Sequence, residues 1–205
     1  IIDFENIMAE LGKLNTLTIL KRLDFGIYLD GGDLDEILLP RRYVPEGCAV
    51  GEQLEVFIYL DSEDKIIATT ETPKAMVGEC AFLNVLEVNR VGAFLDWGLP
   101  KDILVPFGEQ QKPMQVGQSY VVYLYIDPAS ERIAASSTLD KFIGDTSPYY
   151  KEQQQVDLLI CGRTDLGYKA VVDGGTIGLL FNSDVLKPIS IGQTMKGYIK
   201  HIRAD

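Results

Sequence analysis

Residues 91–96 read Val-Gly-Ala-Phe-Leu-Asp, and residues 116–126 read Val-Gly-Gln-Ser-Tyr-Val-Val-Tyr-Leu-Tyr-Ile. The glycines of these two stretches, Gly92 and Gly117, are 25 residues apart. The same spacing occurs in two other glycine pairs, Gly26 with Gly51 and Gly167 with Gly192. Because a fixed internal spacing is the signature of a structural repeat, the sequence predicts three copies of one small unit. We place them at residues 1–73, 74–145 and 146–205.

Each copy contains a stretch in which apolar side chains alternate along the chain. In the first copy Leu54, Val56 and Ile58 point to one side, while Glu55 and Phe57 point to the other. A period of two residues is typical of a half-buried strand, and glycine-rich turns separate the short strands. We therefore expect an all-β protein in which each copy forms a small five-stranded barrel. The third barrel is expected to lack its last strand.

Charge is distributed unevenly over the three copies. The net charge of the 205-residue chain is −11, and the copies carry −9, −3 and +1 in chain order. Phosphate binding depends on clustered Lys and Arg, so only the last copy has a charge that favours nucleic acid. We find no apolar run long enough to cross a bilayer and no apolar leader, and we expect a cytoplasmic protein that does not bind membranes.

The residues needed for metal or catalytic chemistry are scarce. The three cysteines, Cys48, Cys80 and Cys161, have no CxxC spacing, and His201 is the single histidine. A phosphate-binding loop and a nucleophile motif are both absent from the sequence. We therefore predict that the protein is not an enzyme and that it uses no metal or other cofactor.

The motifs of the second copy point to a known type of domain. Their order is Val91-Gly92-Ala93-Phe94-Leu95-Asp96, Asp102-Ile103-Leu104-Val105-Pro106, Val116-Gly117-Gln118, Ile126-Asp127 and Arg132-Ile133-Ala134. Together they resemble the RNA-binding domain that is repeated in the largest protein of the bacterial small ribosomal subunit. The resemblance covers nearly the whole chain and implies three tandem OB-type barrels, the third incomplete.

One stretch indicates a more specific family. Residues 98–106 read Gly-Leu-Pro-Lys-Asp-Ile-Leu-Val-Pro, and with this stretch the chain resembles the conserved virulence factor B-like proteins. In that family three such barrels are followed by a winged helix, which we expect beyond Asp205. The histidine of the family's binding strand is replaced by Pro40, Pro106 and, approximately, Asn182. By the family's pattern, no copy is a complete binding site.

Barrels of this family bind single-stranded RNA on exposed aromatic rings and along a basic groove. The candidate RNA-binding residues that this implies are Phe25, Tyr28, Phe94, Arg132, Tyr168, Lys169, Lys196, Tyr198, Lys200 and Arg203. The alternative for the aromatic residues of the first two copies is that they only pack the barrels. The third copy is expected to make the main RNA contact, because Lys196 and Lys200 flank Tyr198 on one side of a strand.

Two functions follow from these observations. The first is a non-enzymatic protein that binds single-stranded RNA and regulates expression after transcription. The second is an interaction scaffold in which the acidic barrels bind a protein partner and only the C-terminal part touches RNA or DNA. Salt dependence separates the two, because RNA binding weakens steeply with added salt.

Overall fold

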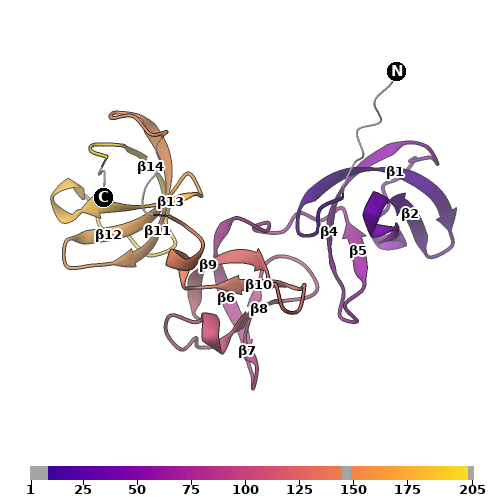
Figure 1. Ribbon diagram of the computed structural model, residues 1–205, viewed down its shortest axis with the longest axis horizontal. Coiled ribbons are helices and arrows are strands. Elements are labelled where there is room, and N and C mark those ends of the chain that lie inside the picture. The colour runs from indigo at the N-terminus through magenta and orange to yellow at the C-terminus, as the bar shows by residue number, and fades with distance from the viewer. Residues whose placement is uncertain (1–8, 145–148, 203–205) are drawn as a thin grey trace. The chain divides into compact units, whose positions relative to one another are not determined.

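The computed structural model describes residues 9–144 and 149–202, and these residues form three β-sheets with short 3-10 turns between strands (Figure 1). The first sheet is a closed barrel in the order β1-β2-β3-β5-β4. Its strands are β1 (Leu14–Leu23), β2 (Gly26–Asp30), β3 (Glu36–Pro40), β4 (Gln53–Leu60) and β5 (Ile66–Thr69). The predicted all-β class is confirmed.

The second and third sheets repeat this strand order. The second sheet has the order β10-β9-β6-β7-β8, from β6 (Cys80–Val88), β7 (Gly92–Asp96), β8 (Ile103–Pro106), β9 (Ser119–Ile126) and β10 (Ile133–Ser136). The third sheet has the order β13-β12-β11-β14, from β11 (Gln155–Arg163), β12 (Gly167–Val172), β13 (Thr176–Phe181) and β14 (Thr194–Tyr198). Within the described residues the third sheet has four strands and no counterpart of β5 or β10, as expected.

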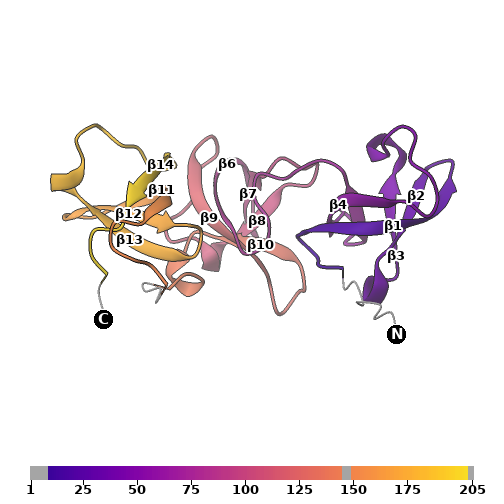
Figure 2. The same ribbon diagram turned by 90° about the horizontal axis from the view of Figure 1, so that it is seen from above.

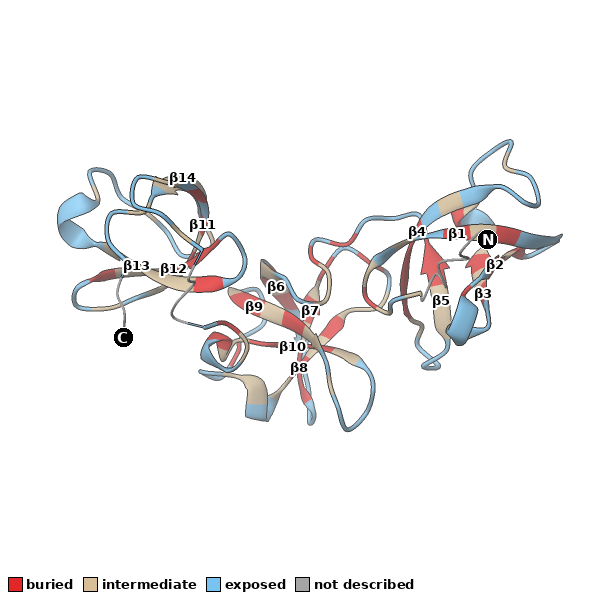
Figure 3. Ribbon diagram, turned by 45° about the horizontal axis from the view of Figure 1, so that its top comes forward, coloured by how far each residue is buried: buried red, intermediate tan, exposed pale blue. Residues whose placement is uncertain are grey.

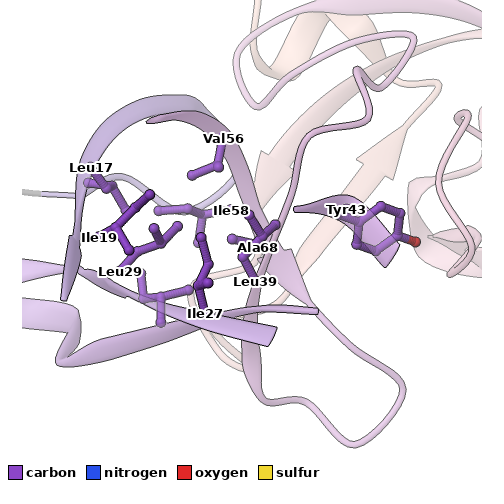
Figure 4. Packing of buried hydrophobic residues seen from close by; sticks show 10 residues of the cluster. Leu17, Ile19, Ile27, Leu29, Leu39, Tyr43, Val56, Ile58 and Ala68 are labelled. Atoms are coloured by element: carbon purple, nitrogen blue, oxygen red, sulfur yellow. The ribbon is translucent and has the colours of Figure 1, made fainter. Parts of the chain in front are cut away.

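The core of the first barrel consists of the alternating apolar residues of its strands (Figure 4). The fully buried side chains include Leu17, Ile19, Ile27, Val56 and Ile58. Burying each such side chain stabilises the fold by about 1.5–3 kcal/mol. The alternation over residues 53–60 thus predicted the inward positions of β4 correctly.

The glycines that open β2, β7 and β12 are required by a close approach of the neighbouring strand. A Cβ atom on Gly26 would lie 2.3 Å from the carbonyl oxygen of Leu39, and one on Gly167 would lie 2.0 Å from that of Leu180. The register shift of the pair β1 and β2 lies on the preceding strand, between Ile19 and Lys21.

The chain divides into two compact units, and each is described by itself. The first unit comprises residues 1–77, 97–102 and 126–133, and the second comprises residues 78–96, 103–125 and 134–205. The predicted boundaries at 73/74 and 145/146 stay a prediction. Among the described residues no helix has the length and apolarity needed to cross a membrane.

In the first unit, aromatic packing covers the outer side of β4. The ring of Trp97 meets the ring of Phe57 edge-on, with centroids 5.7 Å apart, and Phe57 stacks on Tyr59. Both Phe57 and Tyr59 are buried, and burial raises the pKa of Tyr59 to about 12. The outer side of β4 is therefore part of the packed interior of this unit.

In the second unit, residues of the second and third sheets share one apolar cluster. Its buried members are Val121, Leu139, Ile143 and Val171. Phe142 stacks on Tyr123, with ring centroids 4.8 Å apart. Cys80 and Cys161 also pack against this cluster, and burial raises their pKa to about 12 and about 11.

Candidate nucleic-acid interface

Strand register defines equivalent outward positions on the first three strands of each sheet. In the first barrel Tyr28 lies between Lys21 and Leu38. The equivalent rows are Glu87, Phe94 and Leu104 in the second sheet and Gly162, Lys169 and Leu179 in the third. The residues before the opening glycines are Phe25, Val91 and Leu166. We call each row, together with the residue before its opening glycine, a platform. The first platform is thus Phe25 with the row of Tyr28, the second is Val91 with the row of Phe94, and the third is Leu166 with the row of Lys169.

The first platform combines two aromatic rings with a cation. The rings of Phe25 and Tyr28 meet edge-on, with centroids 6.4 Å apart. The Lys21 ammonium lies 4.7 Å from the centroid of the Tyr28 ring, which is within cation–π range. Phe25 is 55% exposed although it is a large apolar residue. The predicted pair Phe25 and Tyr28 is thus brought together, with Lys21 as a member that the sequence did not indicate.

Further cations lie near the first platform. Arg22 follows Lys21 on β1, and its guanidinium donates a hydrogen bond of 2.6 Å to the carbonyl oxygen of Cys48. The backbone N–H of Arg41 donates to the carbonyl oxygen of Phe25 at 2.8 Å, which places an exposed arginine at the edge of the platform. The acidic neighbours are Glu36, which pairs with Lys21, and Asp24, which precedes Phe25 in the turn.

The second platform is less suited to phosphate. Glu87 takes the position of Lys21, and Val91 takes that of Phe25. Phe94 is half-buried on β7. Arg132 belongs to the first unit, where its guanidinium pairs with Asp64. Lys101 pairs with the same carboxylate at 3.3 Å.

In the third sheet, each predicted phosphate-binding lysine that is described pairs with an aspartate. Lys169 pairs with Asp140 at 3.7 Å, Lys196 with Asp157 at 2.5 Å and Lys200 with Asp184 at 3.0 Å. RNA phosphates would have to compete with these carboxylates for the ammonium groups. Tyr198 lies between Lys196 and Lys200 in the sequence and is 69% exposed, but β14 ends at Tyr198, so Lys200 lies outside the strand. The prediction for Arg203 falls outside the described residues.

Strand register locates two aromatic residues of the third copy. Tyr168 packs against the apolar core of its own sheet, because its position is equivalent to that of the buried Ile27. Strand register also corrects the position of the replaced histidine: Gly26 pairs with Pro40 and Gly92 with Pro106, but Gly167 pairs with Phe181 and not with Asn182. Phe181 is 37% exposed, so the third copy presents an aromatic ring that the sequence prediction missed.

Comparisons with known proteins were made for the whole chain. A family model described as S1 domain matches residues 11–71 and 77–137. The uncharacterized protein YitL of Bacillus subtilis (strain 168) is 37% identical over 95 residues, which are 46% of this chain and 32% of that protein. Conserved virulence factor B of Staphylococcus haemolyticus (strain JCSC1435) is 29% identical over 116 residues, which are 53% of this chain and 38% of the relative. The matches thus span about a third of each of these relatives.

A solved structure shares the fold. It is a crystal structure of a multidomain protein with nucleic acid binding domains from Streptococcus pneumoniae TIGR4, at a TM-score of 0.55 and 18% identity. The alignment covers 95% of this chain and 70% of that one. At 18% identity the two chains share the arrangement of their strands, and the likeness does not extend to individual surface residues.

Proposed function

We propose that this chain, which belongs to the S1 domain family and is similar to conserved virulence factor B, binds single-stranded RNA mainly through its first platform. The match to two S1 domains confirms the resemblance expected from the motifs around Gly92 and Gly117. The role as a regulator of expression and the cytoplasmic location are part of the same proposal. In this proposal the chain acts by binding and has no catalytic step.

The single observation that carries the proposal is the cluster of Phe25, Tyr28 and Lys21. A nucleobase can stack on an exposed aromatic ring in any sequence context, and each such stack is worth about 1–3 kcal/mol. A cation beside the rings gives a phosphate of the same nucleotide a partner. Arg22 and Arg41 extend this positive edge, although the first copy as a whole carries −9.

The test is a titration of fluorescently labelled poly-pyrimidine and poly-purine RNA at two salt concentrations. We expect binding that weakens at the higher salt concentration and that weakens about 10- to 100-fold when Phe25 and Tyr28 are both changed to alanine. The matched control changes Phe94 to alanine on the second platform, which should weaken binding less because Glu87 repels phosphate there. RNA binding that is unchanged by the first double substitution would contradict the proposal.

The scaffold function remains a second proposal, supported by the acidic second platform. Glu87, at the position that Lys21 has in the first barrel, suits a basic protein surface better than RNA. A protein captured by the chain whose binding needs Glu87 would favour this second function. RNA binding that depends on Lys21 would favour the first.

A further inference from the structure

In the first barrel the ring of Tyr28 is covered by a lysine. The Lys21 ammonium lies 4.7 Å from the centroid of that ring, and it also pairs with the carboxylate of Glu36. Along the row, the neighbour of Tyr28 on the other side is Leu38 on β3. Because a nucleobase binds by stacking on the face of an aromatic ring, a base that stacks on Tyr28 has to displace Lys21.

The strands fix the positions of the three residues. Lys21 lies opposite Tyr28 in the pairing of β1 with β2, and β1 is exposed from Leu20 to Leu23 (Figure 3). Glu36 lies on β3 opposite Asp30, which is two residues beyond Tyr28 on β2 and therefore on the same side of the sheet. The Lys21 side chain thus reaches from β1 across β2 to a carboxylate on β3. We call this arrangement of Lys21, Tyr28 and Glu36 the lysine cover.

The other two copies do not have this combination at the equivalent positions. In the third copy strand register places Gly162 at the position of Lys21, Lys169 at that of Tyr28 and Ile177 at that of Glu36. In the second copy Glu87 lies opposite Phe94. The ring of the second platform therefore has no lysine at the place from which Lys21 covers Tyr28.

The contacts that hold the lysine cover in place are weak enough to be exchanged. The side chains of Lys21 and Glu36 are both about half exposed, and exposed ion pairs contribute little to stability. A backbone phosphate is an anion that can replace the Glu36 carboxylate as the partner of Lys21. A free base has no charge with which to attract the ammonium. Phe25, which is 55% exposed, needs no such exchange to accept a base.

We propose that the lysine cover makes base stacking on Tyr28 depend on a backbone phosphate, so that the first platform selects an anionic strand over uncharged aromatic ligands. The phosphate takes Lys21 from Glu36, the ammonium moves off the ring, and the base of the same strand stacks on Tyr28. Glu36 is thus a positioning residue, which acts through Lys21. The proposal rests on the proposed function, since it concerns the same platform and the same ligand.

The experiment uses the full chain and two labelled oligomers with the same base sequence. One is single-stranded RNA, and the other is a peptide nucleic acid, whose backbone carries no charge. Glu36→Gln and Lys21→Ala should each bind the neutral oligomer about 2- to 5-fold tighter than the unchanged chain, because each loosens or removes the lysine cover. This is the range that corresponds to one exposed ion pair or cation–π contact.

The matched control is Asp24→Asn. It removes one carboxylate beside Phe25, as Glu36→Gln removes one beside Tyr28, but it leaves Lys21 and Glu36 paired. Both variants should bind RNA more tightly, because each removes a negative charge that repels phosphate. The neutral oligomer does not sense this charge, so its affinity should rise in Glu36→Gln and stay unchanged in Asp24→Asn.

Three results would overturn the proposal. They are an unchanged affinity of Glu36→Gln for the neutral oligomer, an equal rise in Asp24→Asn, and no binding of the neutral oligomer to Lys21→Ala. RNA binding that needs Phe25 and Tyr28, combined with any of these results, would refute the lysine cover and leave the proposed function intact. If the unchanged chain did not bind RNA, the proposed function itself would fail.

Discussion

In the first barrel Lys21 lies over the ring of Tyr28 beside Phe25, whereas in the third sheet Lys169, at the position of Tyr28, pairs with Asp140. The first copy carries −9 and the third +1. The copy with the unfavourable net charge thus presents the arrangement that suits RNA. Net charge counts residues wherever they lie, while binding depends on which cations are placed beside an exposed aromatic ring.

The largest expected effect concerns equivalent aromatic residues on β4 and β14. Phe57 and Tyr198 have the same register position, but Phe57 is buried against Trp97 and Tyr198 is exposed. Changing Phe57 to alanine should lower the free energy of unfolding by about 3–5 kcal/mol, and changing Tyr198 to alanine should alter it by no more than about 0.5 kcal/mol. Urea denaturation measures both. Similar losses would mean that the two strands are packed alike.

The next effect concerns RNA affinity. Replacing Phe25 and Tyr28 together by alanine should weaken binding of single-stranded RNA about 10- to 100-fold, the loss expected for one to two base stacks. The control replaces Phe181 by alanine in the third sheet, and the expected change is smaller because, among the described residues, no cation lies over that ring as Lys21 lies over Tyr28. Fluorescence anisotropy measures both affinities. If the Phe181 variant lost more RNA affinity than the Phe25 and Tyr28 variant, the third sheet would contribute more to binding than the first platform.

A smaller effect separates Lys21 from the lysines of the third sheet. Changing Lys21 to alanine should reduce the slope of log affinity against log salt by up to about one, the value for one lost phosphate contact, because Lys21 lies beside the rings but also pairs with Glu36. Changing Lys169, Lys196 and Lys200 together should reduce it by less than three, because each is paired with an aspartate. A reduction of three in the triple variant would restore the expectation drawn from net charge.

The smallest expected effect is that bound RNA protects the thiol of Cys48 from alkylation. This thiol lies 3.4 Å from a guanidinium nitrogen of Arg22, beside the first platform. RNA bound there should slow its alkylation by a maleimide several-fold, as measured by mass spectrometry. Cys80 and Cys161 should react slowly with or without RNA, because burial raises their pKa and little reactive thiolate forms at neutral pH. Protection confined to Cys161 would place RNA on the third sheet.

The strands could be predicted from the sequence because their information is local. Alternation over residues 53–60 predicted the inward side of β4, and the glycine spacing predicted that one small unit repeats along the chain. The error at Asn182 has a local cause as well: Leu179, Leu180 and Phe181 are all apolar, so this run shows no alternation that could fix its register.

The contacts that decide the candidate site could not be predicted, because they join residues distant in the chain. Lys196 meets Asp157 across the pair β11 and β14, and Lys200 meets Asp184. From the sequence of one strand alone, each of these lysines looks like an unpaired cation, because its aspartate partner lies in another segment of the chain. Lys21 was missed for the related reason that it reaches Tyr28 only through the pairing of β1 with β2 (Figure 2).

The apolar cluster of the second unit limits where this chain can be divided into separate fragments. Val121 comes from the second copy and Val171 from the third, and both are buried in that cluster. Cutting the gene between the two copies would expose this surface on both fragments. The unit that repeats in the sequence is therefore smaller than the unit that can be exchanged between proteins, and we expect recombination to preserve the second and third copies as a pair.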